Sequence, residues 1–570
     1  MAMASSPALF TASRGQTLTY LLAVCPFSIA FLVFINSSVS FVVTDLIGLH
    51  DGEGNAVGTL GFADELLALA ACPLWGVLSD RIGVRHVCAI GYAIIAVALV
   101  LFVQATNVYP QLLLGRLLFS LGGSAVSTMV TAVLPTVTGK ALRDQAYRAS
   151  VSSELTITPA RLNGLQNGHH PDGAATRASP SARLSGFVGL FAGCGALVSL
   201  GVFLPLPARF EKIGLSPAEA IRRSYYLVAA VAMIISLISF IGLRNLSEEE
   251  GKGWRALWSH HSGQHADDQD DDDEAFHGQE RMPYWKQLTT ALLLGFRNRS
   301  IALGYMGGFV ARASSVAISL FIPLAVNHYY RVSGLCNEDH EPMPNSGLGD
   351  IKKACPRAYI LASILTGVSQ LIALLAAPAF GYLTDKSRRY NVPLLVAAFV
   401  GVVGYLAFGF LPNPQFKGPD GNAGVFVVMA LLGISQIGAI VCSLAVLSNG
   451  ILQVGVDDDA LRKIYAEQGV DRQGAHIHNG HSGEGENQPL LAHSVDHRLQ
   501  HLSHLKGSIA GVYSLYGGAG ILILTKAGGS LFDVLSSGTP FYIMAVFNGI
   551  LLVTGLVCGI LNARSKGVSG

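Results

Sequence analysis

Twelve long apolar segments constrain this chain more than any other feature. A helix needs about 20 apolar residues to cross the hydrocarbon core of a bilayer, and each segment comes close to that length. Lipid offers no hydrogen bonds to an exposed backbone, so segments of this kind can cross only as helices. The sequence therefore predicts an all-α membrane protein with twelve transmembrane helices. The predicted spans are residues 20–44, 57–78, 87–106, 110–134, 185–204, 223–243, 301–327, 358–380, 391–411, 424–450, 507–528 and 539–562.

Composition excludes several other classes of protein. Only 13% of the 570 residues are charged, against about 25% in a soluble domain. The net charge is +1, and no basic stripe with interleaved aromatic residues is present, so we expect no nucleic-acid partner. No nucleophile–base pair or phosphate-binding loop stands in a polar segment. We therefore expect neither an enzyme nor a bound cofactor.

The spans fall into two groups of six, which predicts two six-helix bundles. An even number of spans places both termini on one side. The termini and the loops on their side hold 26 Lys and Arg residues, against nine in the opposite loops, and basic loops stay cytoplasmic. The predicted parts are a cytoplasmic tail at 1–19, a bundle at 20–243 with a cytoplasmic insertion at 139–184, a linker at 244–300, a bundle at 301–562 with a cytoplasmic loop at 451–506, and a tail at 563–570.

The polar segments between spans have biased compositions. The linker contains DDQDDDDE at residues 267–274, a charge run that predicts disorder. The 451–506 loop holds seven histidines, but their spacing fits no closed four-ligand site, so we expect a solvated loop and no metal site. Metal sensing by this loop is the alternative. On the opposite side, Cys336 and Cys355 share one loop and could pair in an oxidising compartment.

A short motif in the histidine-rich loop bears on localisation. ENQPLL places Glu486 four residues before the pair Leu490 and Leu491. This pattern resembles the acidic dileucine signal that sorting adaptors bind on endosomal and vacuolar routes. We therefore expect an adaptor as a partner and favour the vacuolar or lysosomal membrane, with the plasma membrane as the alternative.

Two charged loops recur at the same place in each group of six spans. GVLSDRIGVRH at residues 76–86 follows the second span, and GYLTDKSRR at residues 381–389 follows the eighth. Both place a glycine four residues before an aspartate and a basic residue directly after it. The residues that carry the pattern are Gly76, Asp80, Arg81, Gly83, Arg85, Gly381, Asp385, Lys386 and Arg389.

These loops resemble the signature loop of the major facilitator superfamily, Gly-x-x-x-Asp-Arg/Lys-x-Gly followed by basic residues. The second copy departs from it by placing Arg388 where a glycine is expected. The long Ser-, His- and Asp-rich insertions resemble those of fungal members. The resemblance implies the fold of that superfamily and a latch that stabilises the outward-facing state. A carboxylate at the membrane boundary needs a partner, which is either an arginine or the positive end of a helix.

Ionisable and amide side chains inside the spans are candidates for a proton or substrate pathway, because burying them in lipid costs several kcal/mol. These residues are Asp64, Glu65, Arg116, Arg312, Gln370 and Gln436, with Lys526 near the end of the eleventh span. We expect one of the two carboxylates to exchange a proton and to be released from Arg116 when protonated, with Asp64 preferred over Glu65. Static ion pairs that hold the fold are the alternative.

The predicted function is secondary active transport of a small solute by alternating access, with the site near the bilayer midplane between the bundles. We expect a monomer whose partners are a small-molecule substrate and the lipid bilayer. The fifth span lacks the Gly-Pro-x-x-Gly ending of drug antiporters, and LRNLSEEEGKGW after the sixth span does not match sugar porters. A sensor or scaffold that has kept the fold but lost transport, or a metal-responsive transporter, remains open.

Overall fold

The computed structural model describes residues 12–48, 53–154, 180–246, 252, 283–333, 356–387, 391–416, 421–454 and 505–568. Every regular element in these ranges is a helix, and twelve helices are long and apolar enough to cross a membrane. Their spans are Arg14–Val39, Thr59–Ile82, Val84–Phe102, Val108–Val137, Ala182–Lys212, Pro217–Gly242, Arg299–Tyr330, Ile360–Lys386, Val392–Gly409, Gly424–Ile451, Lys506–Phe532 and Thr539–Leu561. The prediction of an all-α membrane protein is confirmed.

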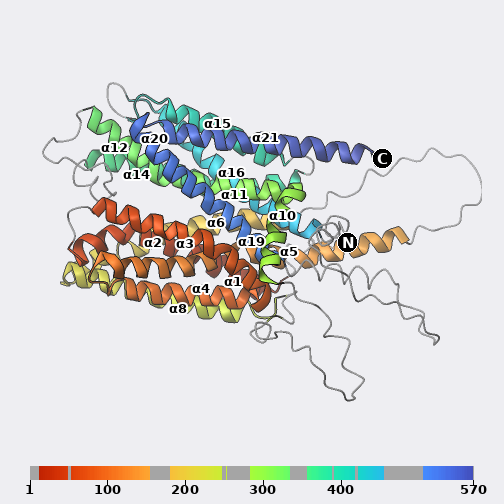
Figure 1. Ribbon diagram of the computed structural model, residues 1–570, viewed down its shortest axis with the longest axis horizontal. Helices are drawn as coiled ribbons and strands as arrows, with labels where there is room; N and C mark the ends of the chain where they lie inside the picture. Colours follow the sequence, from red (N-terminus) through yellow and green to blue (C-terminus); the bar gives the residue numbers. More distant parts are fainter. Residues whose placement is uncertain are drawn as a thin grey trace, which may run out of the picture.

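The helices form two bundles that lie side by side (Figure 1). The first bundle contains α1 (Arg14–Thr19), α2 (Cys25–Phe41), α3 (Glu53–Ile82), α4 (Val84–Phe102), α5 (Leu113–Glu154), α6 (Pro180–Val198), α7 (Leu206–Lys212) and α8 (Pro217–Gly242). The second contains α10 (Tyr284–Arg297), α11 (Arg299–Val316), α12 (Ile322–Val332), α14 (Pro356–Lys386), α15 (Val392–Gly409), α16 (Gly424–Val454), α19 (Lys506–Ile523), α20 (Gly529–Val534) and α21 (Thr539–Val568). Short π-helical turns join α1 to α2, α11 to α12 and α19 to α20 within single spans.

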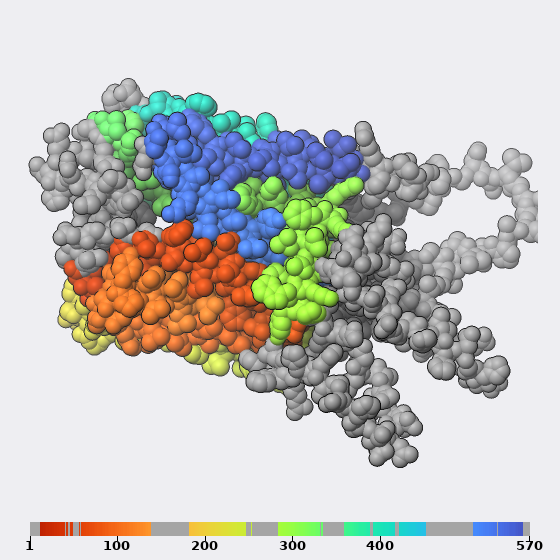
Figure 2. Space-filling view, viewed as in Figure 1, coloured from red at the N-terminus to blue at the C-terminus, as the bar shows by residue number. Residues whose placement is uncertain are grey.

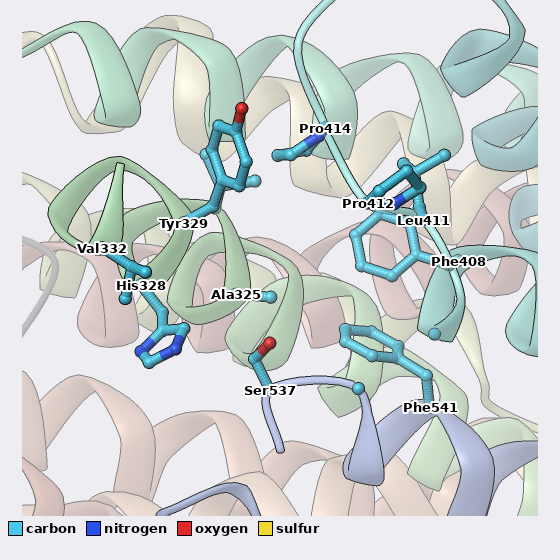
Figure 3. A pocket seen from close by; sticks show the side chains of 13 residues that line it. Ala325, His328, Tyr329, Val332, Phe408, Leu411, Pro412, Pro414, Ser537 and Phe541 are labelled. Atoms are coloured by element: carbon cyan, nitrogen blue, oxygen red, sulfur yellow. The ribbon is translucent and has the colours of Figure 1, made fainter. Parts of the chain in front are cut away.

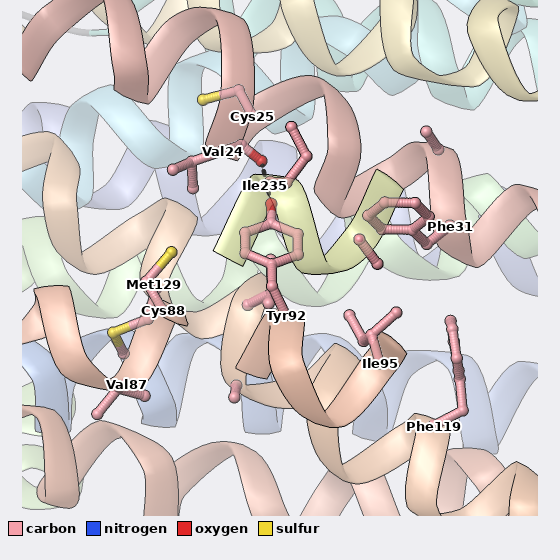
Figure 4. Packing of buried hydrophobic residues seen from close by; sticks show 14 of the residues in the cluster. Val24, Cys25, Phe31, Val87, Cys88, Tyr92, Ile95, Phe119, Met129 and Ile235 are labelled. Carbon is pink, nitrogen blue, oxygen red and sulfur yellow. Dashed lines mark hydrogen bonds between the residues drawn. The ribbon is translucent and has the colours of Figure 1, made fainter. Parts of the chain in front are cut away.

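Large aromatic side chains fill the core of the first bundle (Figure 4). The hydroxyl of the fully buried Tyr92 on α4 donates to the Val24 carbonyl at 2.7 Å, and the ring of Tyr92 contacts Phe31 edge-on. The Tyr20 hydroxyl donates to the Val130 carbonyl at 2.6 Å. Buried hydroxyls need such partners, so these two bonds tie α4 and α5 to the first span.

The hydrophobic cores of the two bundles merge along part of their length. The hydrophobic cluster of the first bundle also contains Ile509, Val512 and Tyr513 from α19. The space-filling view shows the same arrangement, with α19 pressed against the first bundle and α10 crossing near one end (Figure 2). We call this the latch end, because the two signature loops lie there.

The structure departs from the sequence prediction at three places. The first span begins at Arg14 and not at residue 20, because Ser13 and Gln16 form a capping box that starts the helix within the predicted tail. Helix α5 continues to Glu154, well into the predicted insertion at 139–184, since that stretch is rich in alanine and other good helix formers. The linker predicted to be disordered contains α10.

Candidate functional site

The first signature loop joins the two bundles through Asp80. Its carboxylate lies at the end of α3 and accepts hydrogen bonds from the backbone N–H groups of Gly507 and Ser508, both at 2.7 Å. The Ser508 hydroxyl donates a third bond at 2.5 Å, and Asp80 is 4% exposed. Free N–H groups at a helix N-terminus carry partial positive charge. Of the two partners expected for this carboxylate, the structure therefore has the positive end of a helix, α19.

Glycine at position 76 lets α3 and α19 meet backbone to backbone. A Cβ atom on Gly76 would overlap the carbonyl oxygen of Gly507 and lie 2.9 Å from the Cα atom of Gly511. Neither of these neighbours is a side chain that could rotate away. Gly76, Asp80, Gly507 and Ser508 thus form one contact, which we call the first latch.

The second signature loop makes a related contact with different chemistry. Asp385 on α14 accepts a hydrogen bond from Nε of Arg183 on α6 at 2.6 Å. A Cβ atom on Gly381 would lie 2.8 Å from the Cα atom of Gly186. This second latch, formed by Arg183, Gly186, Gly381 and Asp385, repeats the first across the two bundles. An arginine side chain takes the place of the helix N-terminus.

The remaining signature residues have separate roles. Gly83 has a φ of 93° between α3 and α4, a conformation that glycine adopts without strain. Arg85 donates from Nε to the Phe240 carbonyl at 2.6 Å. This bond holds α4 to α8 inside one bundle, whereas the resemblance implies a role for Arg85 in the latch between the bundles. Lys386 is exposed, and Arg389 lies outside the described residues.

Arg81 makes a contact that the motif does not predict. Its guanidinium lies over the ring of Tyr284 on α10, 3.4 Å from the ring centroid. Helix α10 leads into α11 of the second bundle. The cation–π contact is therefore a further link between the bundles at the latch end.

The two latches should respond differently to mutation. The side chain of Arg183 is 35% exposed, and ion pairs near water contribute only about 0–1 kcal/mol. We expect Arg183→Gln to change transport by less than about fivefold, whereas loss of the Asp80 carboxylate should have a much larger effect. Initial transport rates of the two variants at equal protein content measure this. Equal loss in both variants would contradict the asymmetry.

A buried ion pair lies inside the first bundle. Arg116 on α5 contacts both the carboxylate of Asp64 on α3 and the side-chain oxygen of Asn36 on α2. The Ser120 hydroxyl donates to the Asp64 carbonyl at 2.7 Å. Asp64 and Arg116 are 7% and 4% exposed, so the pair is shielded from both lipid and water. The sequence predicts that one of the two carboxylates faces Arg116, and in the structure it is Asp64. Asn36 gives no signal in the sequence.

Glu65 and Arg312 form a more open charged group at the boundary between the bundles. Both are partly exposed, and Glu65 interacts electrostatically with Arg312 and Arg116. Nη2 of Arg312 on α11 donates to the Ser127 hydroxyl on α5 at 2.6 Å. Charged side chains from both bundles therefore interact within the membrane-spanning part of the structure.

The predicted glutamines lie together in the second bundle. Nε2 of Gln370 donates to Oε1 of Gln436 at 3.2 Å, and Nε2 of Gln436 donates to the Ser315 hydroxyl at 3.0 Å. Further along α19 and its extension, the Lys526 ammonium lies 4.3 Å from the centroid of the Phe62 ring on α3. The glutamine contacts lie within the second bundle, whereas Lys526 adds a second cation where the two bundles meet.

A cavity of about 230 Å³ opens in the second bundle at the end opposite the latches (Figure 3). His328 and Tyr329 of α12 lie on one side of it, and Phe408, Pro412 and Phe541 on the other. Its lining comes from the second bundle alone. It is therefore separate from the boundary where Glu65 and Arg312 meet.

The family model described as Major Facilitator Superfamily matches residues 26–153 and 174–453. The chain belongs to the Major Facilitator Superfamily. Comparison with curated proteins gives no match.

Solved structures of the superfamily share the fold. A proton:xylose symporter, XylE, superposes with a TM-score of 0.51 at 11% identity, covering 95% of this chain and 94% of that one. The human organic anion transporter MFSD10 also gives 0.51, at 12% identity and with 96% and 100% coverage. The chain is thus a multi-pass integral membrane protein, and family and fold together support a secondary transporter rather than an enzyme.

Some sequence predictions fall on residues outside the described ranges. These are the acidic run at 267–274, the seven histidines, the sorting motif with Glu486, Leu490 and Leu491, and the cysteines Cys336 and Cys355. They stay predictions.

Proposed function

We propose that this protein carries a small solute across the membrane by alternating access and that the structure is the state closed at the latch end. The observation that carries the proposal is the burial of Asp80 against the N-terminus of α19. A buried carboxylate held by three hydrogen bonds from the other bundle is a contact that forms or breaks as a unit. With cytoplasmic termini, as the basic loops predict, this is the outward-facing state.

The solute pathway runs past Glu65, Arg312, Gln370 and Gln436. Glu65 belongs to the first bundle and the other three side chains to the second, and Arg312 reaches across to Ser127 of the first bundle. Repeat-built transporters bind their substrates between the repeats near the midplane. Charged and amide side chains along the pathway favour a polar solute over a purely apolar one.

Transport itself is testable before the solute is known. Purified protein in liposomes would be exposed to a metabolite extract under an imposed pH gradient, and the retained solutes would be identified by mass spectrometry. We expect one solute class to accumulate in these vesicles but neither in protein-free liposomes nor in liposomes with Gly76→Val. The bulky valine cannot enter the contact between α3 and α19. A profile identical to that of empty liposomes would contradict the proposal and favour a sensor or scaffold.

Proton coupling is part of the proposal. The sequence favours Asp64 as the coupling residue, but the geometry favours Glu65. Asp64 is already neutralised by Arg116 in a closed site, whereas Glu65 is partly exposed at the bundle boundary. We expect Glu65→Gln to abolish accumulation driven by a pH gradient and to spare exchange of substrate for substrate, which needs no net proton movement. Radiolabelled uptake and counterflow measure the two activities. Unchanged accumulation would remove Glu65 from the coupling mechanism.

The vacuolar or lysosomal membrane is the proposed location, with ENQPLL at 486–491 as the adaptor-binding signal. Replacing Leu490 and Leu491 with alanine should move a fluorescently tagged protein toward the plasma membrane, because the adaptor loses its two apolar contacts. Glu219→Gln, a change of an exposed carboxylate in a different segment of the chain, serves as the control. An unchanged distribution in the dileucine variant would rule out this signal.

A further inference from the structure

Helix α10 carries an apolar surface that faces away from the protein. Trp285 and Phe296 are each 74% exposed, and Leu293 is 40% exposed. With 3.6 residues per turn, these three side chains and the partly buried Leu292 fall within one arc of about 100°. Thr289 lies in the same arc, and its hydroxyl donates to the Trp285 carbonyl at 2.9 Å. Exposed aromatic residues at this density are unusual on a surface that meets water.

The other side of α10 is packed against the second bundle. Leu294 and Ala291 are fully buried, and the Tyr305 hydroxyl on α11 donates to the Ala291 carbonyl at 3.1 Å. Gly295 lies against the ring of Tyr305. The helix is therefore fixed in orientation, and its apolar arc cannot turn inward without breaking these contacts.

Both ends of α10 lie at the level where membrane spans end. Its last residue, Arg297, is separated by Asn298 alone from Arg299, where the seventh span begins. At its first residue, Tyr284 lies over Arg81, one residue before the end of the second span. The 14-residue helix is about 21 Å long, so it runs parallel to the membrane surface rather than away from it. Figure 2 shows it crossing the end of the bundle.

Basic residues border the apolar arc on one side. Lys286 and Arg297 fall about 20–40° beyond Leu293 around the helix, and Arg297 is exposed. An apolar arc of tryptophan, phenylalanine and leucine next to basic residues is the pattern of helices that lie in the interface of a bilayer. Anionic lipid headgroups complement the basic border.

We propose that α10 is an interfacial anchor whose Trp285, Leu293 and Phe296 insert into the leaflet at the latch end, with Lys286 and Arg297 against anionic phospholipid headgroups. Tyr284 connects this anchor to Arg81 of the first bundle. Because α10 itself belongs to the second bundle, lipid binding to α10 holds the two bundles together at the latch end. The inference does not depend on transport activity.

The environment of Trp285 tests the insertion directly. Full-length protein and a Trp285→Phe variant would be placed in nanodiscs made with unlabelled phospholipids or with phospholipids brominated near the top of the acyl chain. The difference between their emission spectra isolates Trp285 from the other three tryptophans. We expect brominated lipid to reduce this component at least about twofold and aqueous acrylamide to reduce it much less, because the ring sits at the headgroup–acyl boundary. Strong acrylamide quenching without an effect of bromine would overturn the proposal and indicate contact with water or a soluble partner.

The lipid preference and the link to the latch need a second measurement. Spin labels at exposed Arg244 and Lys386 report the separation of the bundles at the latch end in nanodiscs of phosphatidylglycerol or phosphatidylcholine. We expect the short-distance population to be larger in phosphatidylglycerol for the wild type, and this difference to shrink at least about twofold in Lys286→Gln. Tyr284→Leu keeps an apolar side chain but removes the cation–π contact, and this variant should also lose the difference between the two lipids. A distribution independent of lipid in the wild type would overturn the coupling.

Discussion

Asp80→Asn should leave the protein folded and inserted in the membrane but reduce transport about tenfold or more. Hydrogen bonds to a charged group contribute about 1.5–3 kcal/mol, and every 1.4 kcal/mol is tenfold in an equilibrium constant. The amide keeps the size of the side chain but cannot accept both backbone N–H groups of α19 at full strength. In the variant an NH2 group replaces one of the two oxygens, so a donor faces the backbone N–H of Gly507 or Ser508. The closed state is then destabilised relative to the open one.

Initial transport rates, normalised to the amount of protein in the membrane, measure this effect. Ser508→Ala is the matched partial change, since it removes the hydroxyl donor and keeps both backbone N–H groups. We expect its rate to lie between wild type and Asp80→Asn. Wild-type transport by Asp80→Asn would reduce the signature loop to a determinant of topology.

Asp64→Asn should have the largest effect on stability. Arg116 is 4% exposed, and removing one partner of a buried ion pair costs about 3–5 kcal/mol, because the other charge stays buried. Asn36 remains as a partner of Arg116, but it is neutral and cannot compensate the charge. We expect the thermal unfolding midpoint in detergent or nanodiscs to fall by several degrees.

Two variants separate this stability effect from coupling. Glu65→Gln, on the next residue but outside the buried pair, should unfold close to the wild-type temperature. The double variant Asp64→Asn/Arg116→Leu should recover part of the lost stability, because it removes the uncompensated charge. A wild-type unfolding temperature for Asp64→Asn would show that the pair does not stabilise the bundle.

The sequence was sufficient for the fold because its signals are local. Each span is a continuous apolar run, and the charged loops at 76–86 and 381–389 lie at equivalent positions in the two halves. For Asp80 the sequence predicts one of two kinds of partner, an arginine side chain or the N-terminus of a helix. Choosing between them requires knowing that the N-terminus of α19 lies against the end of α3, a contact between residues more than 400 positions apart.

Other site residues gave no signal of their own. Asn36 and Ser127 stand beside other small polar residues in apolar stretches, and only their contacts with Arg116 and Arg312 give them a role. Arg183 was counted among the basic residues of a loop and proved to be the partner of Asp385. Pairing between distant helices depends on tertiary packing, which a single sequence does not display.

Helix α10 was missed for a different reason. The acidic run at 267–274 dominated the composition of the 244–300 linker and predicted disorder for all of it. The stretch YWKQLTTALLLGFR at its end nevertheless has a strong helical periodicity. At 14 residues it is too short to span a bilayer, so the pattern of apolar spans does not reveal it.

The central claim is that closing of the latch end alternates with closing of the opposite end. Distances between nitroxide labels test it most directly, with one pair at Arg244 and Lys386 on the latch end and another at Gln104 and Leu535 on the opposite end, all at exposed positions. Each pair has one label in each bundle. The account predicts that Asp80→Asn lengthens the latch-end distance and shortens the opposite one in the same population. Unchanged distances at both ends, or lengthening at both ends together, would contradict it.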